Sequence, residues 1–280
     1  MTDFIITFRE TLEAALVVGI VLSYLSQLGQ RSWFKVVYGA VAAAVVLSIF
    51  AGFGLQWYFG GFSGTVEEVY EGIVMLTAAA LITWMVLWMI QQRHVLSQKI
   101  REKVDLHLEK GSRIGIFFLV LLSVLREGIE TVLFLEASAL QSGSNSFFAA
   151  IAGIIVAIVI GYLLFSGLKK VSLRHFFTVT SVVLILFAAG LVAHGVHELQ
   201  EAGWIPVVVE HVWDLNPPVV EEGVYPLLHE EGVIGSLMKG VFGWNGNPSL
   251  LEVLSYAAYL VFICTGWYII DRQKVNGRRV

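Results

Sequence analysis

A single cysteine, Cys264, occurs among the 280 residues, which excludes an intramolecular disulfide and a metal site built from several cysteines. Charged residues are scarce at 14%, against about 25% in soluble domains. The first apolar run, MTDFIITF, follows no basic stretch and ends in no small-residue cleavage pattern, so it is expected to be retained and not to be a removed signal. With 57% hydrophobic residues and a mean hydropathy of +0.76, the composition indicates an integral membrane protein.

Apolar runs of the length that crosses a bilayer as a helix recur along the whole chain. They predict an all-α polytopic membrane protein with a single membrane domain over residues 1–280. The seven expected transmembrane helices cover about 4–26, 36–56, 69–91, 114–138, 147–167, 176–196 and 250–270.

Positive charge is almost absent from alternate connections. The connections 57–68, 139–146 and 197–249 hold one basic residue, Lys239, and two others, Arg9 and Arg126, lie within spans. The remaining Lys and Arg lie in the connections 27–35, 92–113 and 168–175 and in the tail 271–280. By the positive-inside rule, the N-terminus is outside and the C-terminus is cytoplasmic, as expected for a multi-pass protein of the inner (plasma) membrane.

Two connections are long enough to carry structure of their own. The cytoplasmic linker 92–113 mixes charges with apolar residues at helical spacing, which predicts a short interfacial amphipathic helix. The outer segment 197–249 contains all five prolines and eight Asp or Glu, and we expect it to form a folded cap over the outer face.

The pattern R-E-x-x-E occurs twice, as RETLE at 9–13 and as REGIE at 126–130. The copies lie in the first and fourth spans, which run in opposite directions because three spans separate them. The chain is therefore predicted to contain two inverted three-helix repeats, about 4–91 and 114–196, followed by a seventh helix, with a site at the repeat interface.

Helical spacing places both carboxylates of each motif on one face, so Glu10 with Glu13, and Glu127 with Glu130, point in one direction. Each arginine, Arg9 or Arg126, can pair with the second glutamate of its own motif. Four carboxylates and two guanidiniums carry a formal charge of −2, and carboxylate oxygens suit a hard cation. The motifs therefore predict a hard-cation site within the membrane.

Other candidates lie near the outer ends of the third and sixth spans. Glu67 and Glu68 are explained more simply by a solvated helix start, where acidic residues are favoured. Glu71 lies one turn deeper and is the better ligand candidate. The sixth span ends with further candidate residues for collecting cations outside the membrane: His194, His197, Glu198 and Glu201. The simplest interpretation of these residues is a soluble acidic loop, and a cation-collecting vestibule is the functional alternative. Tryptophans at span ends, Trp88 among them, are expected to be interfacial anchors.

Two other functions remain to be weighed. An Arg–Glu pair within a span can be a structural clamp between helices, as in a non-transporting structural or receptor subunit, but a clamp needs no second carboxylate on the same face. HELQE at 197–201 is similar to half of the H-E-x-x-H zinc-protease helix, but Glu201 replaces the second histidine, which disfavours a membrane metallohydrolase.

The chain resembles the oxidase-dependent iron transporters, which include fungal high-affinity iron permeases and bacterial permeases. The stretches that carry the resemblance span nearly the whole chain: RETLE, EGIVML at 71–76, REGIE, HELQEAG at 197–203 and GVFGWNGNPSLLEV at 240–253. Thr11 stands where many members have glycine, and this departure leaves the charged positions intact.

The resemblance implies import of iron, with ferric iron supplied by a separate ferroxidase. It implies that Glu10, Glu13, Glu127 and Glu130 are iron ligands, that Arg9 and Arg126 are their charge partners, and that Glu71 is a ligand at the entrance. It also implies transport and not catalysis, so we expect no catalytic residue, no prosthetic group and no nucleic-acid partner. The residues alone leave open another hard cation, such as manganese.

Overall fold

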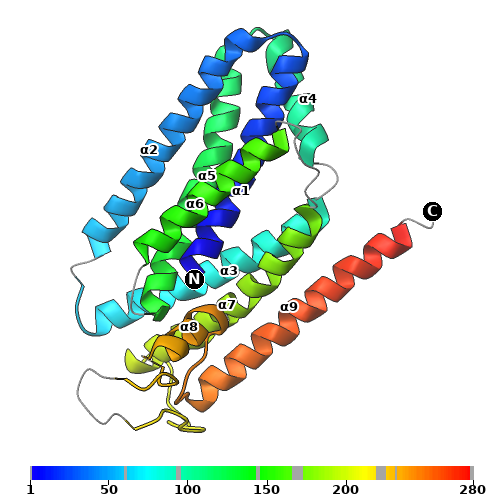
Figure 1. Ribbon diagram of the computed structural model, residues 1–280. Coiled ribbons are helices and arrows are strands. Elements are labelled where there is room, and N and C mark those ends of the chain that lie inside the picture. The colour runs from blue at the N-terminus through cyan, green and yellow to red at the C-terminus, as the bar shows by residue number, and fades with distance from the viewer. Residues whose placement is uncertain are drawn as a thin grey trace.

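The computed structural model describes residues 2–59, 62–92, 96–142, 146–165, 173–218, 225–230 and 232–277, and helices are the regular elements found there (Figure 1). The long helices are α1 (Thr2–Gln27), α2 (Phe34–Phe59), α3 (Thr65–Gln92), α5 (Arg113–Ser142), α6 (Phe147–Phe165), α7 (Leu173–Glu201) and α9 (Leu250–Gly277). Shorter ones are η1 (Arg31–Trp33), α4 (Leu96–Glu109) and α8 (Val233–Phe242).

Each predicted span coincides with one long helix. Five of these helices, α2, α3, α6, α7 and α9, are long and apolar enough to cross a membrane. The helices α1 and α5, which carry the two R-E-x-x-E motifs, do not reach that level of apolarity. The protein is therefore an all-helical polytopic membrane protein, and the full set of seven crossings stays a prediction.

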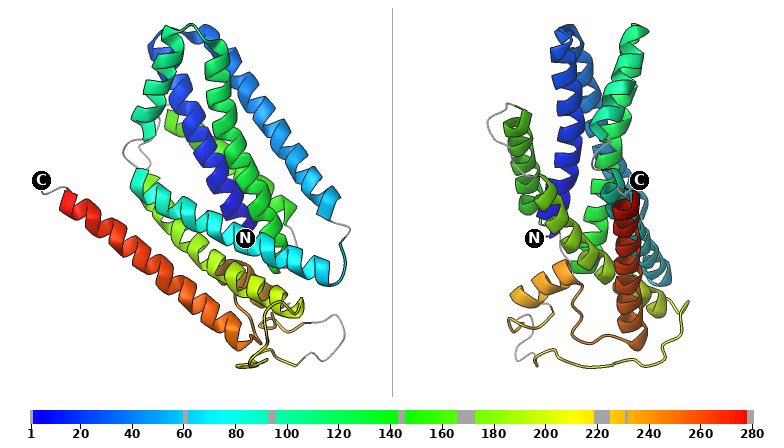
Figure 2. Two further views of the ribbon diagram at one scale, coloured as in Figure 1. Left: turned by 180° about the vertical axis from the view of Figure 1, so that it is seen from behind. Right: turned by 90° about the vertical axis from the view of Figure 1, so that its right-hand side faces the viewer.

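The long helices form two groups. In Figure 1, α1, α2, α5 and α6 run side by side, and α3, α7 and α9 cross beneath them at an oblique angle. Both views in Figure 2 show the same division. The closest pairs are α1 with α6, α2 with α5, and α3 with α7. The first two helices of each predicted half thus pack against those of the other half.

The crossing of α3 and α7 is reciprocal. A Cβ atom on Gly72 would lie 3.0 Å from the carbonyl oxygen of Gly195, and one on Gly195 would lie 3.1 Å from that of Gly72. Leu199 packs over Gly72, and Leu76 packs over Gly195 in the same way. The two backbones therefore approach closely through a Gly-x-x-x-Leu pattern on each helix.

Small residues also let α6 approach α1. The buried positions of α6 are Gly153, Ala157 and Gly161, spaced every four residues along one face. The hydroxyl of Thr7 on α1 donates a hydrogen bond to the carbonyl of Ala150 at 2.9 Å, which fixes this contact. In contrast, Phe148 at the start of α6 is 86% exposed, as a lipid-facing side chain would be.

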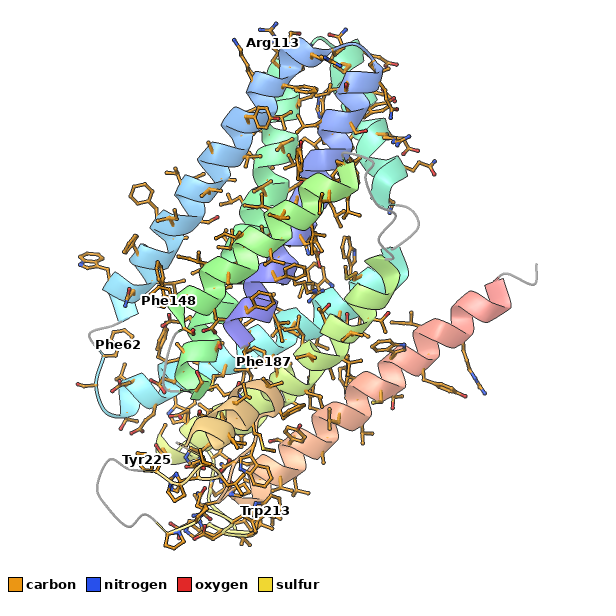
Figure 3. The ribbon with its side chains drawn as sticks, viewed as in Figure 1. Phe62, Arg113, Phe148, Phe187, Trp213 and Tyr225 are labelled. Carbon is orange, nitrogen blue, oxygen red and sulfur yellow. The ribbon has the colours of Figure 1, made fainter. Side chains whose placement is uncertain are left out.

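Two apolar cores lie at opposite ends of α1 and α5. One includes Ile6 and Phe134 together with Phe187 of α7, which lies in the interior of the molecule (Figure 3). The other includes Val21 and Val124. Each motif therefore lies between two apolar clusters along its own helix.

The two connecting regions pack against the ends of the long helices. In α4, Ile100 and Val104 are buried, and Asp105 accepts a hydrogen bond from Tyr24 at 2.6 Å. At the other end, α8 accepts hydrogen bonds through backbone carbonyls: Gly240 from Thr2 at 2.8 Å, and Lys239 from Gln141 at 3.0 Å. The acidic residues Glu221, Glu222 and Glu231 of the predicted cap lie outside the described residues.

Gly153→Ala should destabilise the folded protein. The added methyl group would collide with the hydroxyl of Thr7 and the carbonyl oxygen of Phe4, and overpacking of this kind costs about 1–3 kcal/mol. The measurement is the thermal unfolding midpoint of the purified protein in detergent. Gly54→Ala is the matched control, because its added methyl group meets open space. Equal midpoints for both variants would contradict the close contact between α1 and α6.

Candidate metal site

Three glutamates from the two motifs meet between α1 and α5. One carboxylate oxygen from each of Glu10, Glu127 and Glu130 lies within 4.8 Å of the other two. The residues are 1%, 7% and 7% exposed, respectively. The spacing of three residues puts Glu127 and Glu130 on one face of α5, and the antiparallel packing of α1 brings Glu10 opposite them.

Several oxygens in this cluster have no hydrogen-bond partner within the described part of the chain. They are both oxygens of Glu10, Oε2 of Glu127 and Oε2 of Glu130. Buried carboxylate oxygens without partners are costly, because they have lost their hydration. A bound hard cation would supply the missing interaction, so the cluster is suited to holding one.

Glu13, the fourth predicted ligand, is placed differently. Its Oε1 lies 3.2 Å from Nε of Arg9, one turn away on the same helix. The contact is an ion pair by distance, although neither atom forms a well-aligned hydrogen bond among the described residues. Glu13 is thus the counter-ion of Arg9 in this structure, and it lies outside the three-carboxylate cluster.

The two arginines are not equivalent. Arg9 is fully buried, whereas 35% of the Arg126 side chain is exposed. The Nε of Arg126 donates a hydrogen bond of 2.8 Å to Glu130 and lies 3.9 Å from Glu127. Arg126 therefore pairs directly with the cluster, whereas Arg9 pairs with Glu13 and also interacts electrostatically with Glu10.

Helix α3 contributes contacts to both arginines. The guanidinium of Arg126 lies over the rings of Trp84 and Trp88, at 5.6 and 5.2 Å from their centroids. Nη2 of Arg9 lies 3.5 Å from the sulfur of Met89. No sequence pattern predicted these contacts, and the only signal was the pair of tryptophans, Trp84 and Trp88, near the end of the third span.

Comparison with known proteins decides the family. The family model described as the FTR1 iron permease family matches residues 1–272. This chain belongs to the FTR1 iron permease family. The resemblance to the oxidase-dependent iron transporters is thereby confirmed, and with it the prediction of an iron-transporting membrane permease.

Curated relatives of this iron permease match over nearly its full length. The ferrous iron permease EfeU of Escherichia coli O6:H1 (strain CFT073) is 33% identical over 279 residues, covering 99% of this chain and 98% of the relative. EfeU of Yersinia pestis is 32% identical over 270 residues, covering 92% and 89%. No solved structure matches the chain.

The acidic residues near the start of α3 and the end of α7 lie together and do not belong to the three-carboxylate cluster. Glu71 is half-buried on α3 and interacts electrostatically with Glu67, Glu68, Glu136 and Glu201. Glu198 on α7 interacts with Glu71 in the same way. This group brings together the predicted collecting residues of α3 and α7 and adds Glu136 of α5. Its role in collecting cations stays a prediction.

The two histidines predicted as collecting residues, His194 and His197 of α7, have structural partners. His194 is buried, and its Nδ1 lies 3.2 Å from the carbonyl oxygen of Gly190. Nδ1 of His197 lies 3.0 Å from Glu252 of α9, and its Nε2 lies 3.3 Å from Glu201. His197 thus helps to join α7 to α9.

Glu252, which the sequence analysis did not single out, anchors the start of α9. It accepts a hydrogen bond from the backbone N–H of Ser249 at 3.0 Å, and its own N–H donates to the Ser249 hydroxyl at 3.3 Å. This is the reciprocal capping box that the spacing S-x-x-E in SLLE signals. Asn245 donates a further hydrogen bond of 2.7 Å to Glu252.

Asp3 was also missed. Its carboxylate accepts hydrogen bonds from the Ser138 hydroxyl at 2.7 Å and from the backbone N–H of Ser146 at 2.8 Å. The side chain therefore ties the start of α1 to α5 and to the start of α6. No local sequence pattern predicts this contact, because its two partners are more than 130 residues away.

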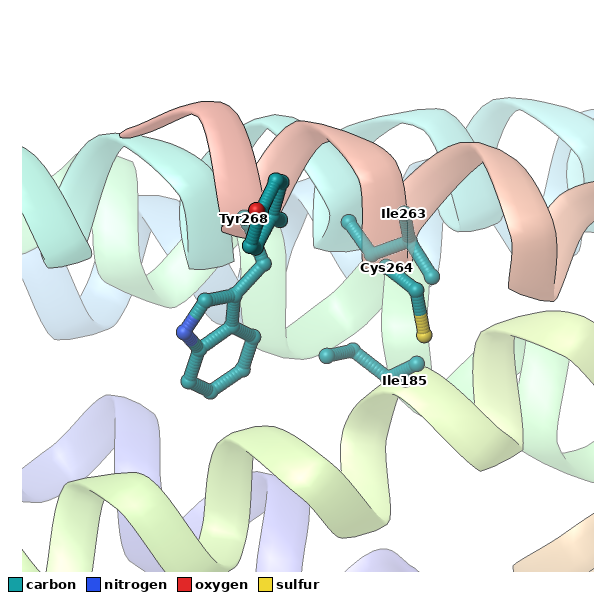
Figure 4. A pocket seen from close by; sticks show the side chains of 5 residues that line it. Ile185, Ile263, Cys264 and Tyr268 are labelled. Atoms are coloured by element: carbon teal, nitrogen blue, oxygen red, sulfur yellow. The ribbon is translucent and has the colours of Figure 1, made fainter. Parts of the chain in front are cut away.

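An apolar pocket lies between α7 and α9, lined by Ile185, Ile263, Cys264, Trp267 and Tyr268 (Figure 4). Its lining contains no carboxylate, and neither helix carries an R-E-x-x-E motif. The pocket therefore contributes nothing to the candidate metal site.

Glu10→Gln and Glu13→Gln should shift the stability of the metal-free protein in opposite directions. Gln at position 10 removes one of three crowded negative charges and offers an N–H donor to the other two carboxylates. Gln at position 13 leaves Arg9 buried without its counter-ion, which costs about 3–5 kcal/mol. Thermal unfolding in detergent with a chelator present measures both changes, and a loss of stability in both variants would contradict this assignment.

Proposed function

We propose that this chain imports iron across the cytoplasmic membrane and binds it at Glu10, Glu127 and Glu130. The observation that carries the proposal is the set of buried, unpartnered carboxylate oxygens where α1 meets α5, in a member of the FTR1 iron permease family. The expected orientation, with the N-terminus outside and seven crossings, is part of the proposal.

The arginines stabilise the carboxylates of the site before iron binds. Three carboxylates brought together in an apolar environment repel one another, and an arginine nearby offsets part of that repulsion. When iron arrives, the carboxylates of Glu127 and Glu130 exchange their interaction with Arg126 for coordination of the metal. The site then stays compensated in both states.

The position of the site favours a pathway that is closed on both sides. Along α1, Glu10 lies between Ile6 and Val21, which belong to different apolar cores. Along α5, Glu127 and Glu130 lie between Val124 and Phe134 in the same way. Transport therefore requires these two cores to open, and the acidic group around Glu71 would raise the cation concentration at the outer one.

The transported species is proposed to be ferric iron produced by a partner ferroxidase. The curated relatives are named ferrous iron permeases, so the oxidation state needs a direct comparison. A negative interior potential favours inward movement of either ion, by about 7 kcal/mol per 100 mV for a trivalent ion and about 4.6 kcal/mol for a divalent ion.

Radioactive iron uptake into proteoliposomes tests the proposal. The purified protein should accumulate iron, and Glu127→Gln should reduce the rate by at least about tenfold, because the neutral amide is a poor ligand for a hard cation. The assay supplies ferrous and ferric iron separately, with manganese as competitor. The matched control is Glu109→Gln, which alters an exposed glutamate of α4.

Each outcome decides between the proposal and a structural role. Normal uptake by folded Glu127→Gln would contradict binding at the cluster. If the charges only hold helices together, Glu127→Gln should transport normally, whereas Arg126→Ala should lower the amount of folded protein in the membrane. Suppression of iron uptake by an equal concentration of manganese would favour the other hard cation.

A further inference from the structure

The end of α3 offers different kinds of side chain to the two arginines. Arg126 lies over two indole rings, Trp84 and Trp88, whereas Arg9 meets the sulfur of Met89. The three residues lie within six positions of one another on α3. One short stretch of this helix thus faces the positive charge of both motifs.

Arg126 uses separate parts of its guanidinium for its two kinds of partner. Its Nε donates the 2.8 Å hydrogen bond to Glu130, and its Cζ lies over the two indole rings. Trp is the best aromatic partner for a cation, and the attraction strengthens when water is excluded. Arg126 can therefore lose the carboxylates and still keep favourable contacts without moving far.

Arg9 has no aromatic ring among its observed contacts, and the other carboxylate with which its charge interacts, Glu10, is itself a proposed iron ligand. It is fully buried, and the thioether of Met89 is a weak acceptor. Separating Arg9 from Glu13 would leave a buried charge with little compensation, which is strongly unfavourable. The Arg9–Glu13 pair is thus suited to staying closed, and the Arg126 pair is suited to opening.

We propose that the indole rings of Trp84 and Trp88 hold Arg126 when iron occupies Glu127 and Glu130. Iron then displaces Arg126 from the carboxylates and leaves the Arg9–Glu13 pair intact. This inference rests on the proposed function and adds two positioning residues to it. The indoles also contact Arg126 while it pairs with Glu130, but there Glu130 already compensates the guanidinium. Their contribution is therefore larger in the iron-bound state, and they raise the affinity for iron.

The test is the concentration dependence of iron uptake in proteoliposomes for Trp88→Leu and Trp88→Phe. Trp88→Leu should raise the half-saturating iron concentration about tenfold, equivalent to about 1.4 kcal/mol, with the maximal rate unchanged. Trp88→Phe keeps an aromatic face and should recover most of the affinity. Trp84→Leu is the second variant, because a side chain that is 56% exposed can be replaced with little effect on folding.

Trp57→Leu, at a tryptophan 87% exposed on α2, is the matched control and should behave like the unaltered protein. An equal loss of iron affinity in the Leu and Phe variants would contradict this role of the tryptophans and indicate simple packing. A lower maximal rate at an unchanged half-saturating concentration would do the same. A normal half-saturating concentration in both Leu variants, with Glu127→Gln inactive, would contradict the role of the tryptophans but not the proposed function. Persistent uptake in Glu127→Gln would contradict both the role of the tryptophans and the proposed function.

Discussion

Charge buried in an apolar helical bundle is the constraint on which this structure depends. Three carboxylates and a fully buried guanidinium lie in the interior of a chain in which 57% of residues are hydrophobic. None of these groups is tolerable alone in such surroundings, since each has given up its hydration. The positions of α1, α5 and α3 follow from this requirement, because the three helices supply the acids, the bases and the rings that compensate one another.

Close packing of helices makes that compensation possible. Apolar surface gives little reason for helices to associate in lipid, so contact relies on small residues and on interhelical hydrogen bonds. Gly153 and Thr7 bring α6 against α1. Gly128, inside the second motif, packs directly against Ser48 and brings α2 against α5. The glycine in REGIE is thus explained by packing, and the motif is both a chemical and a structural unit.

The sequence was sufficient for the parts of the structure that depend on local patterns. Apolar runs located the seven long helices, and i, i+3 spacing put Glu127 and Glu130 on one face of α5. It was insufficient where the outcome depends on how helices cross. The i, i+4 spacing correctly predicted the ion pairs of Arg9 with Glu13 and of Arg126 with Glu130. It did not show that Glu13 would lie outside the cluster that the other three carboxylates form. The contact of Trp88 with Arg126 depends on the oblique path of α3, and no sequence pattern in α3 predicts that path.

The Gly72–Gly195 crossing has a consequence for the origin of the chain. Each helix offers the other the same surface, a glycine backbone followed one turn later by a leucine, and the helices run in opposite directions. A contact in which both sides present the same patch is isologous, the kind of contact that two identical subunits form around a two-fold axis. The crossing of α3 and α7 therefore has the geometry of a homodimer interface within one polypeptide.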